Sequence, residues 1–444
     1  MSARSVAYVT AGGAGMFCGS CMRDNTLAAA LLRLGTQITL VPTFTPIRTD
    51  EVDVSLDRVF LGGINVYLEG KWPALRRLPA ALRRMLDHPR LLRSLSTLTL
   101  QQRSADDGAL AVSLLRGGPQ HRSEMDDLAK FVGTTLKPDM VNLTNLLIAG
   151  FVPALKERYD LPVVVTLQGD DIFLDSLEGG DREAVLVEMR RLARLIDGFI
   201  VFNRYYRDAM ADLLDVPRDR FHVVPLGIAD PEAFGAVPRH SDPAAPTVGY
   251  LARICPEKGF HRLVEAFLQL RTLPGTEAAR LRVAGWLGAS DREFFEQQCR
   301  RLEQSGAGNA FERIELPDRP SKVDFLSQID LLSVPTVYRE PKGIYVLEAL
   351  AARVPVVLPS QGAFPEMLKD LGGGCLVPPN DPTALAQELR RLLLDVARRG
   401  RLGAEGCRRV REAHRDEDMA RGTHDAWERI LMQRGGPTIE SSDP

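Results

Sequence analysis

Three features are scarce in this sequence of 444 residues, and each absence excludes a class of protein. No run approaches the ~18 consecutive apolar residues that a transmembrane helix needs, so we do not expect the chain to span a membrane. Six cysteines are too few for a disulfide framework at this length, and a reducing cytoplasm is the expected location. The formal net charge of -2 gives no general attraction to nucleic acid, so no nucleic-acid partner is expected.

The length of the chain and the order of its apolar segments predict two α/β domains. One hydrophobic core rarely serves more than ~250–300 residues, so the chain should divide. In the first half we expect strands over residues 5–10, 37–41, 140–143, 163–167 and 199–202, with a helix over 25–34. In the second half we expect strands over 248–252, 281–284, 331–334 and 354–358, with helices over 260–270, 293–304 and 344–352. Such alternation predicts two doubly wound, Rossmann-like parallel sheets that face a central cleft.

A change of composition marks the boundary between the two domains. Residues 231–246 hold four prolines among small and polar residues, which predicts an exposed linker. We therefore expect an N-terminal domain over 1–232 and a C-terminal domain over 233–415. A last helix follows over 416–434, and residues 435–444 have the composition of a disordered tail.

A glycine-rich loop follows the first predicted strand and contains Gly13. Such a loop lets backbone amides approach a phosphate or a sugar, but it also suits a tight turn, and both interpretations stay open. It departs from the dinucleotide fingerprint, because Cys18 stands where the third glycine belongs and the second strand lacks a following carboxylate. This disfavours a nicotinamide-dependent dehydrogenase. Cys18 and Cys21 have redox or metal spacing, but without a second pair we interpret them as incidental thiols.

Two cations follow the first strand of the C-terminal domain. Arg253 ends that strand, and Lys258 closes the next loop just before the helix over 260–270. Positive charge at a strand's carboxyl end and beside a helix N-terminus suits a diphosphate, although a pair of solvated surface charges is the alternative.

A pair of glutamates accompanies the apolar helix over 344–352. Glu340 lies in the loop ahead of the helix, whereas Glu348 lies inside it. A carboxylate in so apolar a helix needs partners, because an unpaired buried charge is costly. Ribose hydroxyls are suitable partners, and an arginine from a neighbouring helix is the alternative. The helix start at Gly343 and Ile344 follows a proline, which leaves backbone amides to point at a phosphate.

With these motifs the sequence resembles glycosyltransferase family 4, whose GT-B members share the pattern Glu-Pro-x-Gly-x-x-x-x-Glu. Supporting matches in the same order are residues 224–228, 252–259, 362–366 and 378–382. The resemblance implies the GT-B fold, with Arg253 and Lys258 on the donor diphosphate. It also implies that Glu348 binds the ribose, that Glu340 lies against the transferred sugar, and that the last helix crosses back to the N-terminal domain.

Three positions depart from the family pattern or add to it. A histidine often follows the strand over 163–167 in the family, but Gln168 stands here and cannot become a cation. Asp170, two residues later, could contact a ligand or the acceptor, or it could be a turn residue. Lys342 adds a third positive charge near the predicted phosphates. With these cations available a metal is unnecessary, so we expect no metal and no cofactor.

The resemblance implies a metal-independent, retaining transferase of hexosyl type that uses a nucleotide-sugar donor. The N-terminal domain would bind a glycan, a lipid-linked acceptor or a small molecule. A GT-B isomerase or phosphorylase and a non-catalytic sugar-nucleotide-binding protein are the alternatives. Residues 71–93 hold seven basic residues and one acidic residue interleaved with leucines. This predicts either a solvated basic helix or a peripheral contact with the inner face of a membrane.

Overall fold

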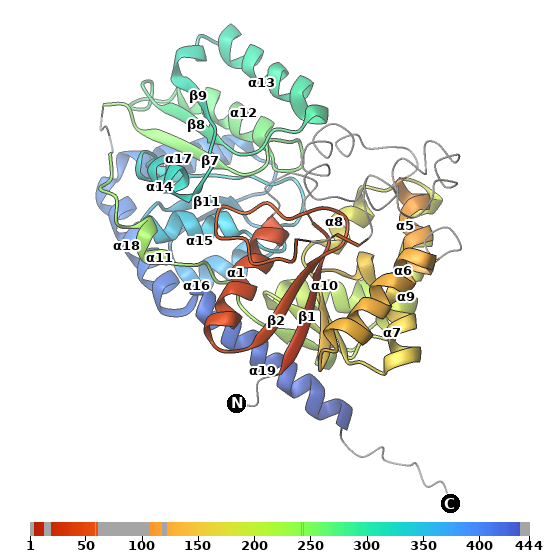
Figure 1. The fold of residues 1–444 in the computed structure, drawn as a ribbon. Helices are drawn as coiled ribbons and strands as arrows, with labels where there is room; N and C mark the ends of the chain where they lie inside the picture. The colour runs from red at the N-terminus through yellow and green to blue at the C-terminus, as the bar shows by residue number, and fades with distance from the viewer. Residues whose placement is uncertain are drawn as a thin grey trace, which may run out of the picture.

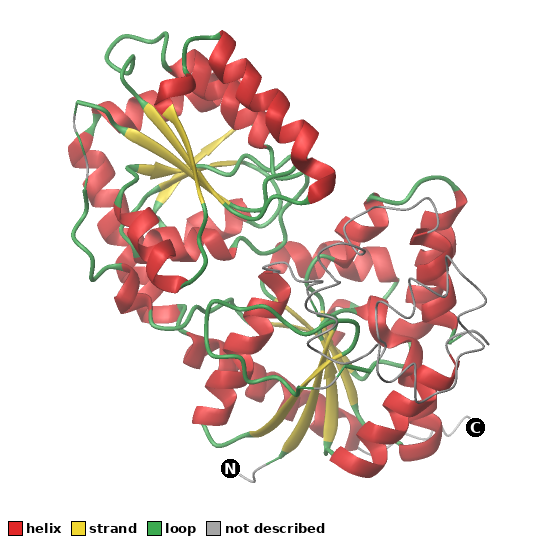
Figure 2. Ribbon diagram, turned by 45° about the horizontal axis from the view of Figure 1, so that its top comes forward, coloured by secondary structure: helices red, strands yellow, loops and turns green. Residues whose placement is uncertain are grey.

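The computed structural model describes residues 4–12, 19–57, 59–60, 107–117, 122–240, 242 and 244–435. The predictions made for Gly13, Cys18, residues 71–93 and residues 436–444 fall outside these ranges. Within them, the two predicted parallel sheets are confirmed, and Figures 1 and 2 show each sheet enclosed by helices on both faces.

The first sheet has six parallel strands in the order β2-β1-β3-β4-β5-β6. The strands are β1 (Ser5–Thr10), β2 (Gln37–Pro42), β3 (Met140–Leu143), β4 (Val163–Thr166), β5 (Gly198–Val201) and β6 (Phe221–Val223). Alternate residues of β1 face opposite layers: Val6 and Tyr8 pack with helix α1 (Gly19–Arg33), whereas Ala7 and Val9 pack on the other side. The helices of that second layer include α5 (Asp107–Arg116), α6 (Arg122–Lys130), α7 (Val152–Tyr159) and α9 (Gly180–Ala193).

The second sheet also has six parallel strands, in the order β12-β11-β10-β7-β8-β9. The strands are β7 (Thr247–Leu251), β8 (Arg280–Ala284), β9 (Phe311–Ile314), β10 (Leu331–Leu332), β11 (Val356–Pro359) and β12 (Gly374–Val377). The helices are α11 (Pro231–Phe234), α12 (Phe260–Leu270), α13 (Arg292–Gln304), α14 (Arg319–Ser327), α15 (Ile344–Ala351), α16 (Phe364–Leu371), α17 (Pro382–Leu394) and α18 (Val396–Ala413).

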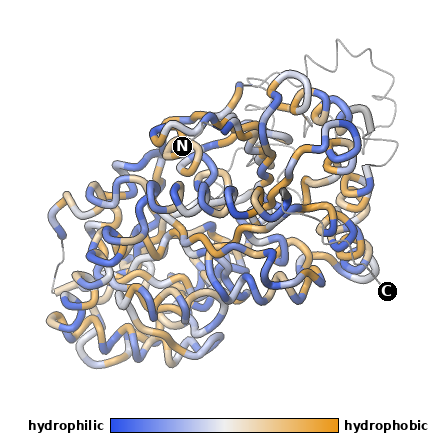
Figure 3. Tube along the Cα trace, turned by 90° about the horizontal axis from the view of Figure 1, so that it is seen from below, coloured by the Kyte–Doolittle hydropathy of each residue, from blue (hydrophilic) through white to orange (hydrophobic). Residues whose placement is uncertain are grey.

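Apolar residues at helical spacing fix these helices on their sheets. In α12 the buried residues fall at helical spacing: Phe260, Leu263, Val264, Ala266, Phe267 and Leu270. The tube in Figure 3 shows hydrophobic and hydrophilic residues interspersed along the coils of the chain. Of the helices in the described ranges, none combines the length and apolar content needed to cross a membrane.

The last helix, α19 (Asp416–Gly435), packs against the first sheet after the chain has completed the second. Trp427 is 2% exposed there and donates its indole N–H to Oδ1 of Asn142 in β3 at 2.9 Å. The chain crosses between the domains twice, and the two crossings lie side by side, since Ile228 pairs with Arg415.

Two predicted features differ from the structure. Helix α1 begins at Gly19, six residues before the predicted start, because its first turns bury polar residues such as Asp24 that give no apolar signal. The proline-rich segment 231–246 is not a fully exposed linker. Phe234 is 2% exposed within the core of the second domain, and Arg239 donates to backbone carbonyl groups of that domain.

Strand order reverses between β1 and β3 in the first sheet and between β7 and β10 in the second. In open α/β sheets, ligands bind at the carboxyl ends of the strands beside such a reversal. The loops after β7 and β10 are therefore the place to look for a site.

Candidate active site

The three cations and Glu340, all predicted to act on the donor, lie in those two loops. Arg253 and Lys258 belong to the loop from β7 to α12, while Glu340 and Lys342 belong to the loop from β10 to α15. The fold thus brings together two motifs that lie far apart in the sequence, the separation of Lys258 and Glu340 being 82 positions.

Glu340 is a buried carboxylate, with 2% of the residue exposed. Its Oε2 lies 2.5 Å from Nζ of Lys258. Burial alone would raise the pKa of Glu340, but the charge and hydrogen bond of Lys258 outweigh it, and the pKa falls below its usual value. Glu340 therefore stays ionised at neutral pH.

Two tyrosines complete the environment of the Glu340 carboxylate. The hydroxyl groups of Tyr338 and Tyr345 donate to the same Oε2 at 2.9 and 3.3 Å. Nζ of Lys258 lies 5.1 and 5.4 Å from the centres of these two rings, within the range of cation–π attraction. Sequence reasoning missed both tyrosines, although they flank Glu340 within five positions.

The backbone around Glu340 is held by the loop that follows β11. A Cβ atom on Gly362 would lie 2.6 Å from the backbone N and O of Glu340, so only glycine fits there. Ala363 donates its N–H to the Glu340 carbonyl at 2.8 Å. Gly343 has φ of 73°, a left-handed conformation that turns the chain into α15 at Ile344.

Arg253 lies at the edge of this cluster with 40% of its side chain exposed. Its Nε donates to Sγ of Cys255 at 3.2 Å, and its charge acts on the hydroxyl of Tyr338. Lys342 extends to the other domain, where its Nζ donates to Oγ of Ser20 in α1 at 2.6 Å. The charge of Lys342 also lowers the pKa of Glu340, so three cations act on one small region.

Glu348 is 7% exposed and has a charged partner. That partner is Lys322 of α14, whose Nζ lies 2.8 Å from Oε1 of Glu348. The same Nζ lies 2.6 Å from Oδ2 of Asp50, which belongs to the N-terminal domain. The alternative considered from the sequence, a cation from a neighbouring helix, thus describes this contact, with lysine in place of arginine.

Gln168 points into a buried polar cluster of the N-terminal domain. Its Nε2 donates at 2.8 Å to Oδ1 of Asp24 and to Oγ1 of Thr144. Oε1 of Gln168 is buried and has no hydrogen-bond partner in the part of the chain that the structure describes. The loop that carries Gln168 nevertheless reaches the segment beside Glu340, since a Cβ atom on Gly169 would lie 3.8 Å from Cγ of Pro341.

Asp170 is 2% exposed and braces the same loop. Its two oxygens accept hydrogen bonds from the backbone N–H groups of Leu146, at 2.7 Å, and Gln168, at 3.2 Å. Burial raises the pKa of Asp170 to about 7. These contacts match the interpretation of Asp170 as a turn residue, since both oxygens already accept from backbone.

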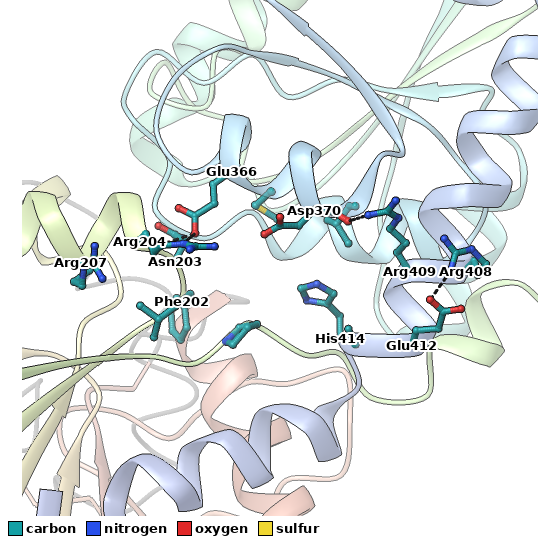
Figure 4. Close-up of a pocket in the computed structure, with 15 residues that line it drawn as sticks. Phe202, Asn203, Arg204, Arg207, Glu366, Asp370, Arg408, Arg409, Glu412 and His414 are labelled. Carbon is teal, nitrogen blue, oxygen red and sulfur yellow. Dashed lines mark hydrogen bonds and ion pairs between the residues drawn. The ribbon is translucent and has the colours of Figure 1, made fainter. Parts of the chain in front are cut away.

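A separate cleft of about 740 Å³ lies beside the two chain crossings (Figure 4). Residues of both domains line it, including Arg204, Glu366, Arg408 and His414. Glu366 reaches across and accepts hydrogen bonds from the first backbone N–H groups of helix α10 (Arg204–Leu214). Of the predicted site residues that the structure describes, none lines this cleft, and it is distinct from the cluster around Glu340.

Family models of glycosyltransferases match both halves of the chain. Residues 25–227 match the model of the glycosyl transferase 4-like domain, and residues 238–409 match that of glycosyl transferases group 1. The chain belongs to glycosyltransferase family 4. It is accordingly a glycosyltransferase, and the two matched segments correspond to its two domains.

Individual relatives of this glycosyltransferase are distant. It is 28% identical to D-inositol 3-phosphate glycosyltransferase of Xylanimonas cellulosilytica, over 64% of this chain and 70% of that protein. It is also 28% identical to glycogen synthase of Mycobacterium tuberculosis, over 59% of this chain and 61% of that protein.

Solved structures show the fold of this glycosyltransferase over almost its whole length. Sucrose-phosphate synthase of Thermosynechococcus elongatus superposes with a TM-score of 0.69 at 16% identity, over 97% of this chain and 100% of that one. HepE of Anabaena, crystallised with UDP and glucose, superposes with a TM-score of 0.67 at 13% identity. The superposition covers 96% of this chain and 100% of that one. The predicted GT-B fold is confirmed.

Among the residues that the structure describes, no three His, Cys, Asp or Glu side chains are placed together as metal ligands. The arrangement does supply fixed cations: Lys258 against Glu340, with Arg253 and Lys342 beside them.

Proposed function

We propose that this glycosyltransferase moves a hexosyl-type sugar from a nucleoside-diphosphate sugar to an acceptor hydroxyl, with retention and without a metal ion. The observation that carries the proposal is the cluster in which Lys258, Tyr338 and Tyr345 hold the Glu340 carboxylate beside Arg253. It lies where ligands bind in such sheets, at the reversal of strand order.

The cations suit a leaving diphosphate. When the bond from the sugar to phosphate breaks, negative charge grows on the phosphate oxygens, and fixed positive groups stabilise it. The Lys258 ammonium has three N–H groups and gives one to Glu340, so it can also donate to phosphate. Arg253 is partly exposed and able to reach a ligand, and Lys342 adds charge from the other loop.

The glutamates suit the two ends of the donor. Glu340 is ionised and held in one orientation, as a group that accepts hydrogen bonds from sugar hydroxyls must be. Glu348, one turn into α15, would accept from the ribose. The structural neighbour HepE was crystallised with UDP and glucose, which supports a donor of this class.

The proposed transfer step takes place on one face of the sugar. The acceptor oxygen bonds to the anomeric carbon as the bond to the phosphate oxygen breaks, and both events take place on the same face of the sugar. The acceptor's proton passes to the departing phosphate oxygen, so no enzyme base is required. We propose that the N-terminal domain binds the acceptor, a glycan, a lipid-linked molecule or a small molecule, in the cytoplasm or at the inner face of the membrane.

A thermal-shift screen of UDP, GDP, ADP and their sugars tests the donor site. A ligand at ~100 times its Kd stabilises a protein by about 2.7 kcal/mol, which is measurable. At least one nucleotide should raise the Tm of the parent, and Lys258→Ala should reduce the shift for the sugar nucleotide and the free nucleotide alike. A protein that none of these ligands stabilises would contradict the proposal.

A further inference from the structure

Lys322 joins the predicted nucleoside site to the other domain. Its Nζ lies between two carboxylates, 2.8 Å from Oε1 of Glu348 in α15 and 2.6 Å from Oδ2 of Asp50 in the loop after β2. The side chains of Lys322, Asp50 and Glu348 are only 10%, 5% and 9% exposed. The Lys322 ammonium group therefore contacts a glutamate of the C-terminal domain and an aspartate of the N-terminal domain at the same time.

Lys322 carries the positive charge that holds the carboxylates of Asp50 and Glu348 in place. Burial alone would lower the pKa of Lys322, but the two carboxylates outweigh it and raise the pKa above its usual value. The lysine is thus charged at neutral pH. Without it, two buried carboxylates would lie close together with no cation between them, which is a costly arrangement.

The geometry also leaves Glu348 able to bind a ligand. Lys322 contacts one carboxylate oxygen, Oε1, so the second oxygen can accept a hydrogen bond from a ribose hydroxyl. A carboxylate fixed through one oxygen presents the other in a defined direction, which reduces the entropy that binding would otherwise cost.

We propose that Lys322 is a positioning residue for ribose recognition, and that Asp50 of the N-terminal domain holds Lys322 in place. The affinity of the C-terminal domain for a nucleotide then depends on a contact with the other domain. This inference rests on the proposed function, because it takes Glu348 to be the residue that binds the ribose.

The neighbouring ion pair provides a matched control. Arg319, one turn before Lys322 in α14, lies 3.4 Å from Glu51 of the N-terminal domain. This pair crosses between the domains at the same place, but the described contacts of Arg319 and Glu51 do not include Glu348. Glu51→Gln therefore weakens the same domain contact without removing a partner of Glu348.

The test measures Kd by calorimetry for UDP, GDP and ADP, and for the 2′,3′-dideoxy form of whichever binds most tightly. We expect Lys322→Met to weaken the binding of the ribonucleotide about tenfold, since it removes the charged partner of Glu348, and Asp50→Asn about threefold, since it weakens only the hold on Lys322. Both should leave the dideoxy nucleotide nearly unchanged. Lys322→Arg should restore most of the lost affinity, and Glu51→Gln should bind both nucleotides as the parent does.

The outcomes separate this inference from the proposed function. If Lys322→Met and Asp50→Asn bind the ribonucleotide like the parent, or lose both nucleotides equally, Lys322 does not act through the ribose. If Glu348→Gln discriminates ribose from dideoxyribose as well as the parent, the proposed role of Glu348 is wrong. A parent protein that binds none of the three nucleotides would overturn both. If Lys322→Met fails to fold, Asp50→Asn provides the test. Its affinity for the ribonucleotide, relative to that for the dideoxy nucleotide, then shows whether Lys322 acts through the ribose.

Discussion

Removal of the Lys258 ammonium should destabilise the C-terminal domain through the carboxylate that it leaves behind. Glu340 is 2% exposed, and Lys258→Met deletes its charged partner at 2.5 Å while Tyr338 and Tyr345 still donate. Breaking a buried ion pair from one side typically costs about 3–5 kcal/mol. Because two hydroxyl donors remain and the Lys258 side chain is 18% exposed, we expect a loss near the lower limit, about 3 kcal/mol.

Scanning calorimetry at pH 7 measures this loss. At ~2–4 °C per kcal/mol for a domain of this size, the variant should melt roughly 6–12 °C below the parent. The double variant Lys258→Met, Glu340→Gln should recover most of the difference, because a neutral amide needs no ammonium partner.

The dependence on pH gives a second test of the same reasoning. In the parent the pKa of Glu340 lies below its usual value of 4.5, so its stabilisation is present above pH 4.5 and is lost as pH falls through the lower, folded-state pKa. In Lys258→Met no lysine charge counters the effect of burial, so the pKa of Glu340 should rise. The difference in Tm between the parent and Lys258→Met should therefore become smaller at acidic pH. Equal melting of the single and double variants, or a gap that is constant with pH, would refute the account of Glu340.

Three further predictions concern other parts of the molecule. Burial raises the pKa of Asp170 from 3.8 to about 7, so the free energy of unfolding should fall as pH rises from about 4 to 7, and Asp170→Asn should flatten that slope in melting curves. Parallel curves for parent and variant would contradict this. Sugar transfer should survive EDTA, because cations take the place of a metal; activity that EDTA abolishes and magnesium or manganese restores would show otherwise. If residues 71–93 bind anionic lipid, the protein should sediment with anionic vesicles at low salt but less at moderate salt. If the double variant Arg83→Glu, Arg84→Glu sediments as the parent does, residues 71–93 are not the lipid contact.

The sequence predicts the interior strands of both sheets and the edge strand β2, and it misses the other three edge strands, β6, β9 and β12. Interior strands such as β4 and β7 are buried on both faces and appear as continuous apolar runs. β9 has the sequence Phe-Glu-Arg-Ile and lies at an edge, with its two central residues exposed. β6 and β12 are also edge strands, and β6 is only three residues long. Half-exposed edges and short strands carry little periodic signal, so topology alone reveals them.

In the candidate site, features set by neighbouring residues can be predicted from the sequence, whereas contacts between residues far apart in the chain cannot. The spacing of Glu340 and Glu348 on one loop and helix can be predicted from sequence, because a helix fixes it locally. The partner of Glu348 cannot, because Lys322 lies 26 positions away on another helix. Lys322 in turn meets Asp50, 272 positions away, only through the packing of two domains. Gln168 turns inward for a similar reason: its partner Asp24 lies 144 positions away.

Consumption of the donor, followed by NMR, tests the central claim most directly. The nucleotide sugar that binds most tightly would be incubated with candidate acceptors and with parent protein or Glu340→Ala, and the anomeric protons observed. The account predicts that the parent forms a product with the anomeric configuration of the donor. It also predicts that Glu340→Ala, although it still binds the free nucleoside diphosphate, turns over at least about a hundredfold more slowly, as expected for a lost transition-state contact. A product of inverted configuration, or equal turnover by parent and variant, would contradict it.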